Sequence, residues 1–289
     1  MLRYLKLFTQ FPPIKAIIGY FFCMGLLGIS QRLVLKPLIY MIIDDVAIAD
    51  TLRISLAIVW LLACYGIFVK YFERRKAAEI DFANWKKEIV AGVALGFGCI
   101  SLSISILYLL GNYQFIGISF AGYNAKVLVI LLLAALIEDL LHRGLILRIL
   151  EQWLGTYLAL ALAVSIEMQH FANPNIEFSF TELLLFVLWG FTLGLMYVYT
   201  KRIWLPFAFH IGWNFAQPFY GSNLTGLDDM GKIIDARFVG SESITGGAVG
   251  IEGSVFTILI LFTLSATFLY LSIKGGKIVK SKIAWLPSI

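Results

Sequence analysis

Residues 127–150 read VLVILLLAALIEDLLHRGLILRIL, and this stretch decides what kind of protein the chain forms. It is long enough to cross a bilayer, which takes about 20 mainly apolar residues. Near its middle it nevertheless carries Glu138, Asp139, His142 and Arg143. Ionisable side chains cost about 2.5–3.5 kcal/mol each at the centre of a membrane helix, so such a group predicts a functional site.

The rest of the chain is equally apolar. Of its 289 residues, 60% are hydrophobic and 14% are charged, and the mean hydropathy is +0.86. A typical soluble domain is roughly 45–50% apolar and about 25% charged. The composition therefore excludes a water-soluble globular protein. We expect an all-α, polytopic membrane protein with a single integral-membrane domain over residues 1–289.

Eight segments are apolar enough to be candidate membrane helices, and they predict one bundle of about eight transmembrane helices. The segments are residues 16–43, 54–72, 89–110, 127–150, 157–171, 183–199, 203–220 and 249–273. The first is long and is expected to be interrupted near Arg32 and Lys36.

Basic and non-basic loops alternate along the chain. Lys and Arg collect in residues 70–87, at 201–202 and in residues 274–282, whereas the connections between them are acidic or uncharged. Because cytoplasmic loops of membrane proteins are enriched in Lys and Arg, both termini and residues 70–87 are predicted to be cytoplasmic. Residues 221–247 are then a mobile loop outside. The localisation we expect is the cell membrane.

The net charge of +5 fits contact with a lipid bilayer better than nucleic-acid binding, which we do not expect. Cys23, Cys64 and Cys99 all lie in apolar stretches. They indicate small buried side chains rather than a disulfide framework or a cysteine metal cluster.

Two further apolar segments carry polar residues at helical spacing. Glu167 and His170 are three residues apart, and His210 and Asn214 are four apart, so each pair shares one helix face. A buried carboxylate such as Glu138 can take a proton from water, and imidazole and amide donors can stabilise an oxyanion. Either these groups act without metal, or Glu138, His170 and His210 hold Zn²⁺. Both arrangements suit hydrolysis of a peptide bond inside the membrane.

Three motifs in order carry a family resemblance. The run 138–144, EDLLHRG, resembles the E-E-x-x-x-R signature of the CPBP family, which comprises type II CAAX prenyl endopeptidases and relatives tied to bacteriocin immunity. Residues 166–170, IEMQH, resemble its F-x-x-x-H signature, and His210 to Asn214 match its H-x-x-x-N signature. The motif core covers about residues 131–215.

The resemblance implies an eight-helix intramembrane protease, of glutamate or metallo type, acting on a membrane-bound peptide or protein, with CAAX-prenylated proteins among the candidate substrates. By carry-over, Glu138 and His170 would activate water, while His210 and Asn214 would stabilise the oxyanion. Asp139 and Arg143 would pair and hold the first motif helix in place.

Two residues depart from the family pattern. Asp139 replaces a Glu and Ile166 replaces a Phe, and neither change removes a residue with an implied catalytic role. The sequence leaves open whether His142 and Glu167 take part. It also leaves two other functions to weigh: a catalytically silent immunity or scaffold protein of the same fold, and a proton-coupled transporter.

Overall fold

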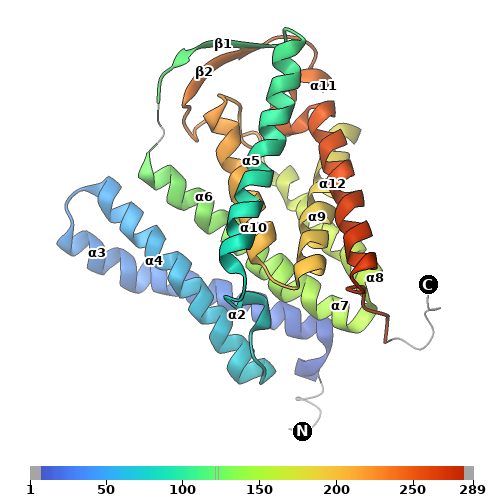
Figure 1. Ribbon diagram of the computed structural model, residues 1–289. Helices are drawn as coiled ribbons and strands as arrows, with labels where there is room; N and C mark the ends of the chain where they lie inside the picture. Colours follow the sequence, from blue (N-terminus) through green and yellow to red (C-terminus); the bar gives the residue numbers. More distant parts are fainter. Residues whose placement is uncertain (1–7, 121, 123, 283–289) are drawn as a thin grey trace.

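The computed structural model describes residues 8–120, 122 and 124–282, which form a bundle of helices with a small β-ribbon at one end (Figure 1). The outermost residues of both termini, predicted to be cytoplasmic, lie outside the described residues. The first helical hairpin pairs one continuous run, made of α2 (Pro12–Ser30) and α3 (Lys36–Ile42), with α4 (Val46–Ile67).

The expected interruption of the first segment is a π-helical stretch rather than a break. The π-helical turn Gln31–Leu35 joins α2 to α3, and Pro37 sits in the first turn of α3. Proline has no N–H to donate and its ring crowds the carbonyl four residues earlier, so the preceding turn widens. The helix therefore continues through Arg32 and Lys36.

Three long helices pack around the helix of the third motif: α5 (Trp85–Leu109) and α9 (Phe180–Thr200) contact it, and α12 (Val255–Lys274) packs against α9. The first motif lies in one continuous run made of α6 (Ala125–Glu138), a π-helical stretch (Asp139–Leu147) and α7 (Arg148–Leu154). The second motif lies in a 3-10 extension (Ser165–Ala172) of α8 (Thr156–Val164), and the third lies in α10 (Trp204–Phe219).

Side-chain caps fix where several helices begin. Asp45 accepts backbone N–H bonds at the start of α4, Asn124 does so for α6, and Ser179 does so for α9. Such caps satisfy N–H groups that have no partner inside the helix.

Five helical stretches are long and apolar enough to cross a membrane, so the chain is a multi-pass membrane protein. They are Pro12–Ile42, Val46–Glu73, Trp85–Leu109, Phe180–Thr200 and Val255–Lys274. The other three predicted spans are the motif segments, which are either too short or too charged to be recognised by apolar length alone. The helical membrane architecture is confirmed, and the count of eight stays a prediction.

Glycines bring α5 and α10 into backbone contact. A Cβ at Gly92 would lie 2.8 Å from the carbonyl oxygen of Leu205, and one at Gly96 would collide with the carbonyl oxygen of Phe209. This is the small-xxx-small packing of membrane helices. It places α10, with most of its residues buried, at the centre of the bundle.

Two strands form in loops for which the sequence predicted no regular structure. Strand β1 (Tyr113–Ile118) pairs antiparallel with β2 (Ile234–Phe238), with Tyr113 opposite Phe238. The short helix α11 (Glu242–Thr245) follows β2. The stretch 221–247, expected to be a mobile loop, is thus tied to the loop that follows α5.

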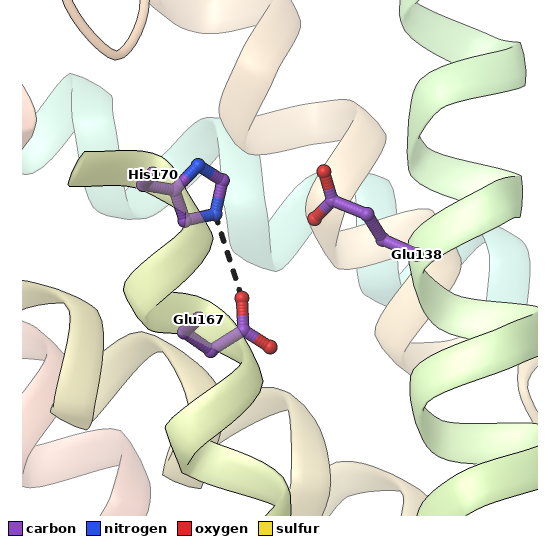
Figure 2. Close-up of side chains that lie close together, drawn as sticks. All are labelled: Glu138, Glu167 and His170. Carbon is purple, nitrogen blue, oxygen red and sulfur yellow. Dashed lines mark ion pairs between the residues drawn. The ribbon is translucent and has the colours of Figure 1, made fainter. Parts of the chain in front are cut away.

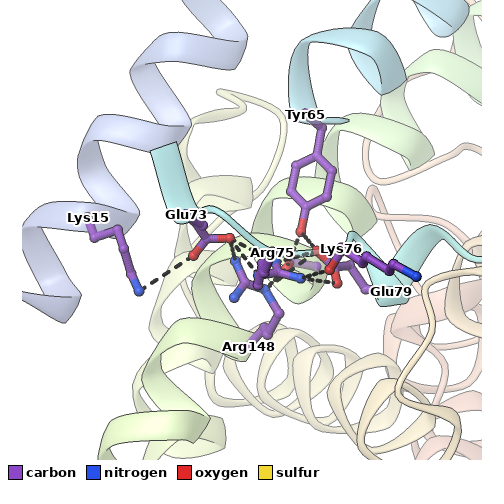
Figure 3. A network of polar contacts seen from close by, with 8 residues as sticks. Lys15, Tyr65, Glu73, Arg75, Lys76, Glu79 and Arg148 are labelled. Atoms are coloured by element: carbon purple, nitrogen blue, oxygen red, sulfur yellow. Dashed lines mark hydrogen bonds and ion pairs between the residues drawn. The ribbon is translucent and has the colours of Figure 1, made fainter. Parts of the chain in front are cut away.

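An ionic network joins three helices at the opposite end of the bundle (Figure 3). The Arg75 guanidinium donates to both carboxylate oxygens of Glu79, and Tyr65 donates to Glu79 and to the carbonyl oxygen of Gly144. Glu73 links this group to Lys15 and Arg148. The network anchors the π-helical stretch of the first motif to α2 and α4.

Glu79 makes stability depend on pH. Burial alone would raise its pKa, but the Arg75 hydrogen bonds and the Arg148 charge outweigh burial and hold the pKa below its usual value. The pKa of a Glu side chain in the unfolded chain is about 4.3. Because the pKa of Glu79 is lower in the folded protein, its contribution to stability is complete above this value. The contribution is lost as the pH falls through the folded pKa.

We therefore predict that Glu79→Gln lowers the thermal unfolding midpoint at pH 7, since breaking a buried ion pair costs roughly 3–5 kcal/mol. The difference from wild type should shrink as the pH is lowered below about 4. Thermal unfolding of purified protein in detergent measures both effects. Glu177→Gln, at an exposed carboxylate, is the control. If the unfolding midpoints of wild type and Glu79→Gln differed by the same amount at all pH values, Glu79 would not be the source of the pH dependence.

Candidate active site

A cavity of about 490 Å³ lies where the three motif segments meet. Glu138, His170, His210 and Asn214 all line it. The structure thus brings together the four residues that the sequence nominated. The remaining walls are mostly apolar, with Phe186 and Trp189 of α9 among them.

Glu138 and His170 face one another across the cavity, with Glu167 beside them (Figure 2). The Nε2 atom of His170 lies 3.5 Å from a carboxylate oxygen of Glu167. The two residues are three apart in a 3-10 helix, where such positions are eclipsed. The His170 ring also stacks on Phe186, with ring centroids 5.0 Å apart. These contacts fix the imidazole on the side of the cavity opposite Glu138.

Arg143 is fully buried and binds two carboxylates. Its Nη2 atom lies 2.7 Å from Glu167, and its Nε atom lies 3.7 Å from Asp139. The predicted Asp139–Arg143 pair is therefore present, but the closer partner of Arg143 comes from the second motif segment. Gly190 of α9 leaves room for Glu167, because a Cβ there would lie 2.8 Å from its Cγ.

Asp139 makes its closest polar contact with His210. The Asp139 carboxylate lies 3.0 Å from Nδ1 of His210, and both residues are buried. Trp189 packs edge-on against the His210 ring, with centroids 5.0 Å apart. Asn214 follows one turn later on α10 and lines the same cavity. Each cavity histidine thus faces its own carboxylate.

Glu252 also lines the cavity, and sequence reasoning missed it. It lies in a 3-10 turn (Ile251–Gly253) before α12, and its Oε2 atom accepts hydrogen bonds of 3.1 Å from Trp213 and Gln217 of α10. The only signal in the sequence is a single acid near the start of the last apolar segment. No motif marks it, because its position depends on a loop that packs against α10.

His142 is buried away from this cavity. Its Nδ1 atom lies 3.8 Å from Glu167, and its side chain helps to line a separate, mainly apolar pocket beside α2. His142 therefore contacts Glu167 but does not line the cavity itself.

The residues that could hold a metal ion differ from the predicted set of Glu138, His170 and His210. Glu138, Glu167 and His170 offer ligand atoms that all lie within 4.8 Å of one another. His210 is not in this group, and its Nδ1 atom already faces Asp139. Two carboxylates and one imidazole are acceptable zinc ligands. Glu167 thus takes the place expected for His210.

Comparison with known proteins gives one match. Residues 120–216 match the family model described as type II CAAX prenyl endopeptidase Rce1-like. This segment is similar to the Rce1-like family. The resemblance inferred from the three motifs is confirmed, since all three lie inside the matched residues. Neither the curated proteins nor the solved structures yielded a match.

The Rce1-like match supports a CAAX-type intramembrane protease, which is a hydrolase acting on a membrane-associated protein. Glu252 lies outside the matched residues.

We predict that Arg143→Ala strongly reduces the amount of folded protein. The change leaves two buried carboxylates, Asp139 and Glu167, without their cation, and loss of one partner of a buried pair costs roughly 3–5 kcal/mol. Yield in the membrane fraction and the thermal unfolding midpoint measure the loss. Arg237→Ala, at an exposed arginine of β2, should be neutral. Normal yield and midpoint for Arg143→Ala would show that the guanidinium does not hold the site together.

Proposed function

We propose that the protein is an intramembrane endopeptidase that hydrolyses a peptide bond of a membrane-associated protein or peptide. The observation that carries the proposal is the convergence of Glu138, His170, His210 and Asn214 on one cavity. The Rce1-like match over the same segments supports it.

Glu138 is the proposed general base. Its carboxylate takes a proton from a water molecule, and the resulting hydroxide attacks the carbonyl carbon of the substrate. The Oε2 atom of Glu138 is buried and has no hydrogen-bond partner among the described residues, so it is free to receive that proton. Glu138 then returns the proton to the departing amine as the C–N bond breaks.

His170 orients the water from the opposite wall. Glu167 holds the imidazole by its contact with Nε2, and Arg143 neutralises Glu167 on its other side. Glu167 is therefore a positioning residue that acts through His170.

His210 and Asn214 are the proposed oxyanion donors. Nδ1 of His210 faces the Asp139 carboxylate, so Nε2 is the ring nitrogen left to donate to the oxyanion. The Asn214 amide supplies the second donor.

A catalytic metal is the competing arrangement. Zn²⁺ held by Glu138, Glu167 and His170 would polarise the bound water and the substrate carbonyl. We propose the metal-free arrangement, because Arg143 already binds Glu167 and places a positive charge beside the metal position.

Substitution at Glu138 tests the activity. We predict that Glu138→Gln and His170→Ala abolish cleavage but leave the protein folded and inserted, since each acts directly on the water. Comparing the membrane proteome of cells that express wild type or Glu138→Gln reveals substrates as uncut chains in the variant. Glu177→Gln is the matched control. Wild-type cleavage by Glu138→Gln would contradict the base assignment, and identical proteomes would favour an immunity or scaffold role.

Substitution at Asn214 and metal analysis test the mechanism. Asn214→Ala should lower the rate by about 10²–10³, the usual effect of losing one oxyanion donor. Purified active protein should lack stoichiometric metal by mass spectrometry and should keep its activity in chelator. Stoichiometric zinc, with activity lost to chelator and restored by zinc, would instead establish a metalloprotease.

A further inference from the structure

The basic loops gather at one end of the bundle. The loop after α4 contacts the α9–α10 turn, because Ile203 donates to the carbonyl oxygen of Glu79. Arg202 of the same turn pairs with Glu88 in the first turn of α5. Lys201 of the same turn pairs with Glu151 of α7. The described C-terminal residues join them, since Thr156 donates to the carbonyl oxygen of Val279. We call this the basic end.

The other end of the bundle is built from the remaining loops. Figure 1 shows β1, β2 and α11 there, away from α7. Asn173 and Asn175 of the loop after the second motif donate to the carbonyl oxygens of Thr225 and Gly226. Asn223 in turn donates to the carbonyl oxygen of Ala248, close to the turn that carries Glu252. We call this the ribbon end.

The cavity reaches the protein surface at the ribbon end and also between two motif segments, where the lining residues Ala134 and Gln169 are exposed. Its lining includes Asn173, Pro174, Leu227 and Met230, and Pro174 and Leu227 are exposed. None of the described residues of the basic-end loops lines it. Glu138 is the last residue of α6 and lines the cavity, whereas the π-helical stretch after it leads to the ionic network at the basic end.

The charge distribution orients the two ends in the membrane. Residues 70–87, 201–202 and 274–282 together hold twelve Lys and Arg, and all three segments lie at the basic end. Residues 221–247, at the ribbon end, hold two, Lys232 and Arg237. Loops rich in Lys and Arg remain in the cytoplasm.

We infer that the cavity opens on the extracytoplasmic side of the membrane and takes a peptide segment presented from that side. The inference rests on the proposed function and names its substrate class: the extracytoplasmic part of a membrane-inserted or exported peptide, not a cytoplasmic C-terminal tail.

The charges in the cavity agree with this substrate class. Its described lining includes the carboxylates Glu138 and Glu252 but no Lys or Arg. The Oε1 atom of Glu252 is buried and has no hydrogen-bond partner among the described residues. The free α-carboxylate of a CAAX tail would meet two acids and no cation. An uncharged or basic internal segment avoids that repulsion.

Cysteine labelling in intact cells tests the orientation. Asp229→Cys lies in the exposed stretch beside Leu227, and Ala78→Cys lies at the exposed surface of the basic end. The native Cys23, Cys64 and Cys99 are buried and give the background. A membrane-impermeant maleimide should label Asp229→Cys in intact cells and Ala78→Cys only after permeabilisation. The reverse pattern, or labelling of both positions from one side, overturns the inference.

A bulky maleimide then tests access to the cavity. Attached from outside to Asp229→Cys, it should reduce Glu138-dependent cleavage at least tenfold, whereas labelling of Ala78→Cys in permeabilised cells should not. Unchanged cleavage after complete labelling of Asp229→Cys overturns the proposed entry route but leaves the protease assignment standing. Absence of any Glu138-dependent cleavage instead contradicts the proposed function, and the labelling pattern still decides the orientation.

Discussion

The ion pairs of Arg143 are the interaction on which the site depends. This buried guanidinium lies 2.7 Å from Glu167 and 3.7 Å from Asp139, on two different helical segments. Each of these carboxylates faces one cavity histidine, His170 or His210. Electrostatic interactions are strong where water is excluded, and a buried carboxylate without a partner is costly. One cation therefore holds two carboxylate–imidazole pairs in register around Glu138.

The surrounding helices make this polar centre tolerable in a membrane. Helix α10 is only 16 residues long and most of them are buried, because glycines of α5 let the two backbones touch. The 3-10 extension of α8 is short as well. Ionisable residues at membrane depth are accommodated when they face the inside of a bundle. The longer apolar helices supply that enclosure.

The sequence predicted the helical membrane class and the three motif segments, since apolar length and residue spacing are local properties. The four residues it nominated as catalytic, Glu138, His170, His210 and Asn214, line one cavity, while their chemical roles stay predictions. It did not predict Glu167 as the closer partner of Arg143, because that contact joins two helices and depends on how they pack. Asp139 is one methylene shorter than the Glu of the family pattern. Its carboxylate lies closer to His210 than to Arg143, the partner that the sequence predicted. Glu252 and the β-ribbon were missed for the same reason: long-range packing of loops creates both.

The measurement that tests the central claim most directly is a double-mutant cycle between Arg143 and Glu167. Wild type, Arg143→Met, Glu167→Met and the double variant are compared by their free energy of unfolding in detergent. If the pair organises the site, the double variant should lose less unfolding free energy than the two single variants lose together. The difference, which is the coupling energy, should be about 1–3 kcal/mol. Strictly additive losses would show that the two residues stabilise the protein independently and would contradict the account.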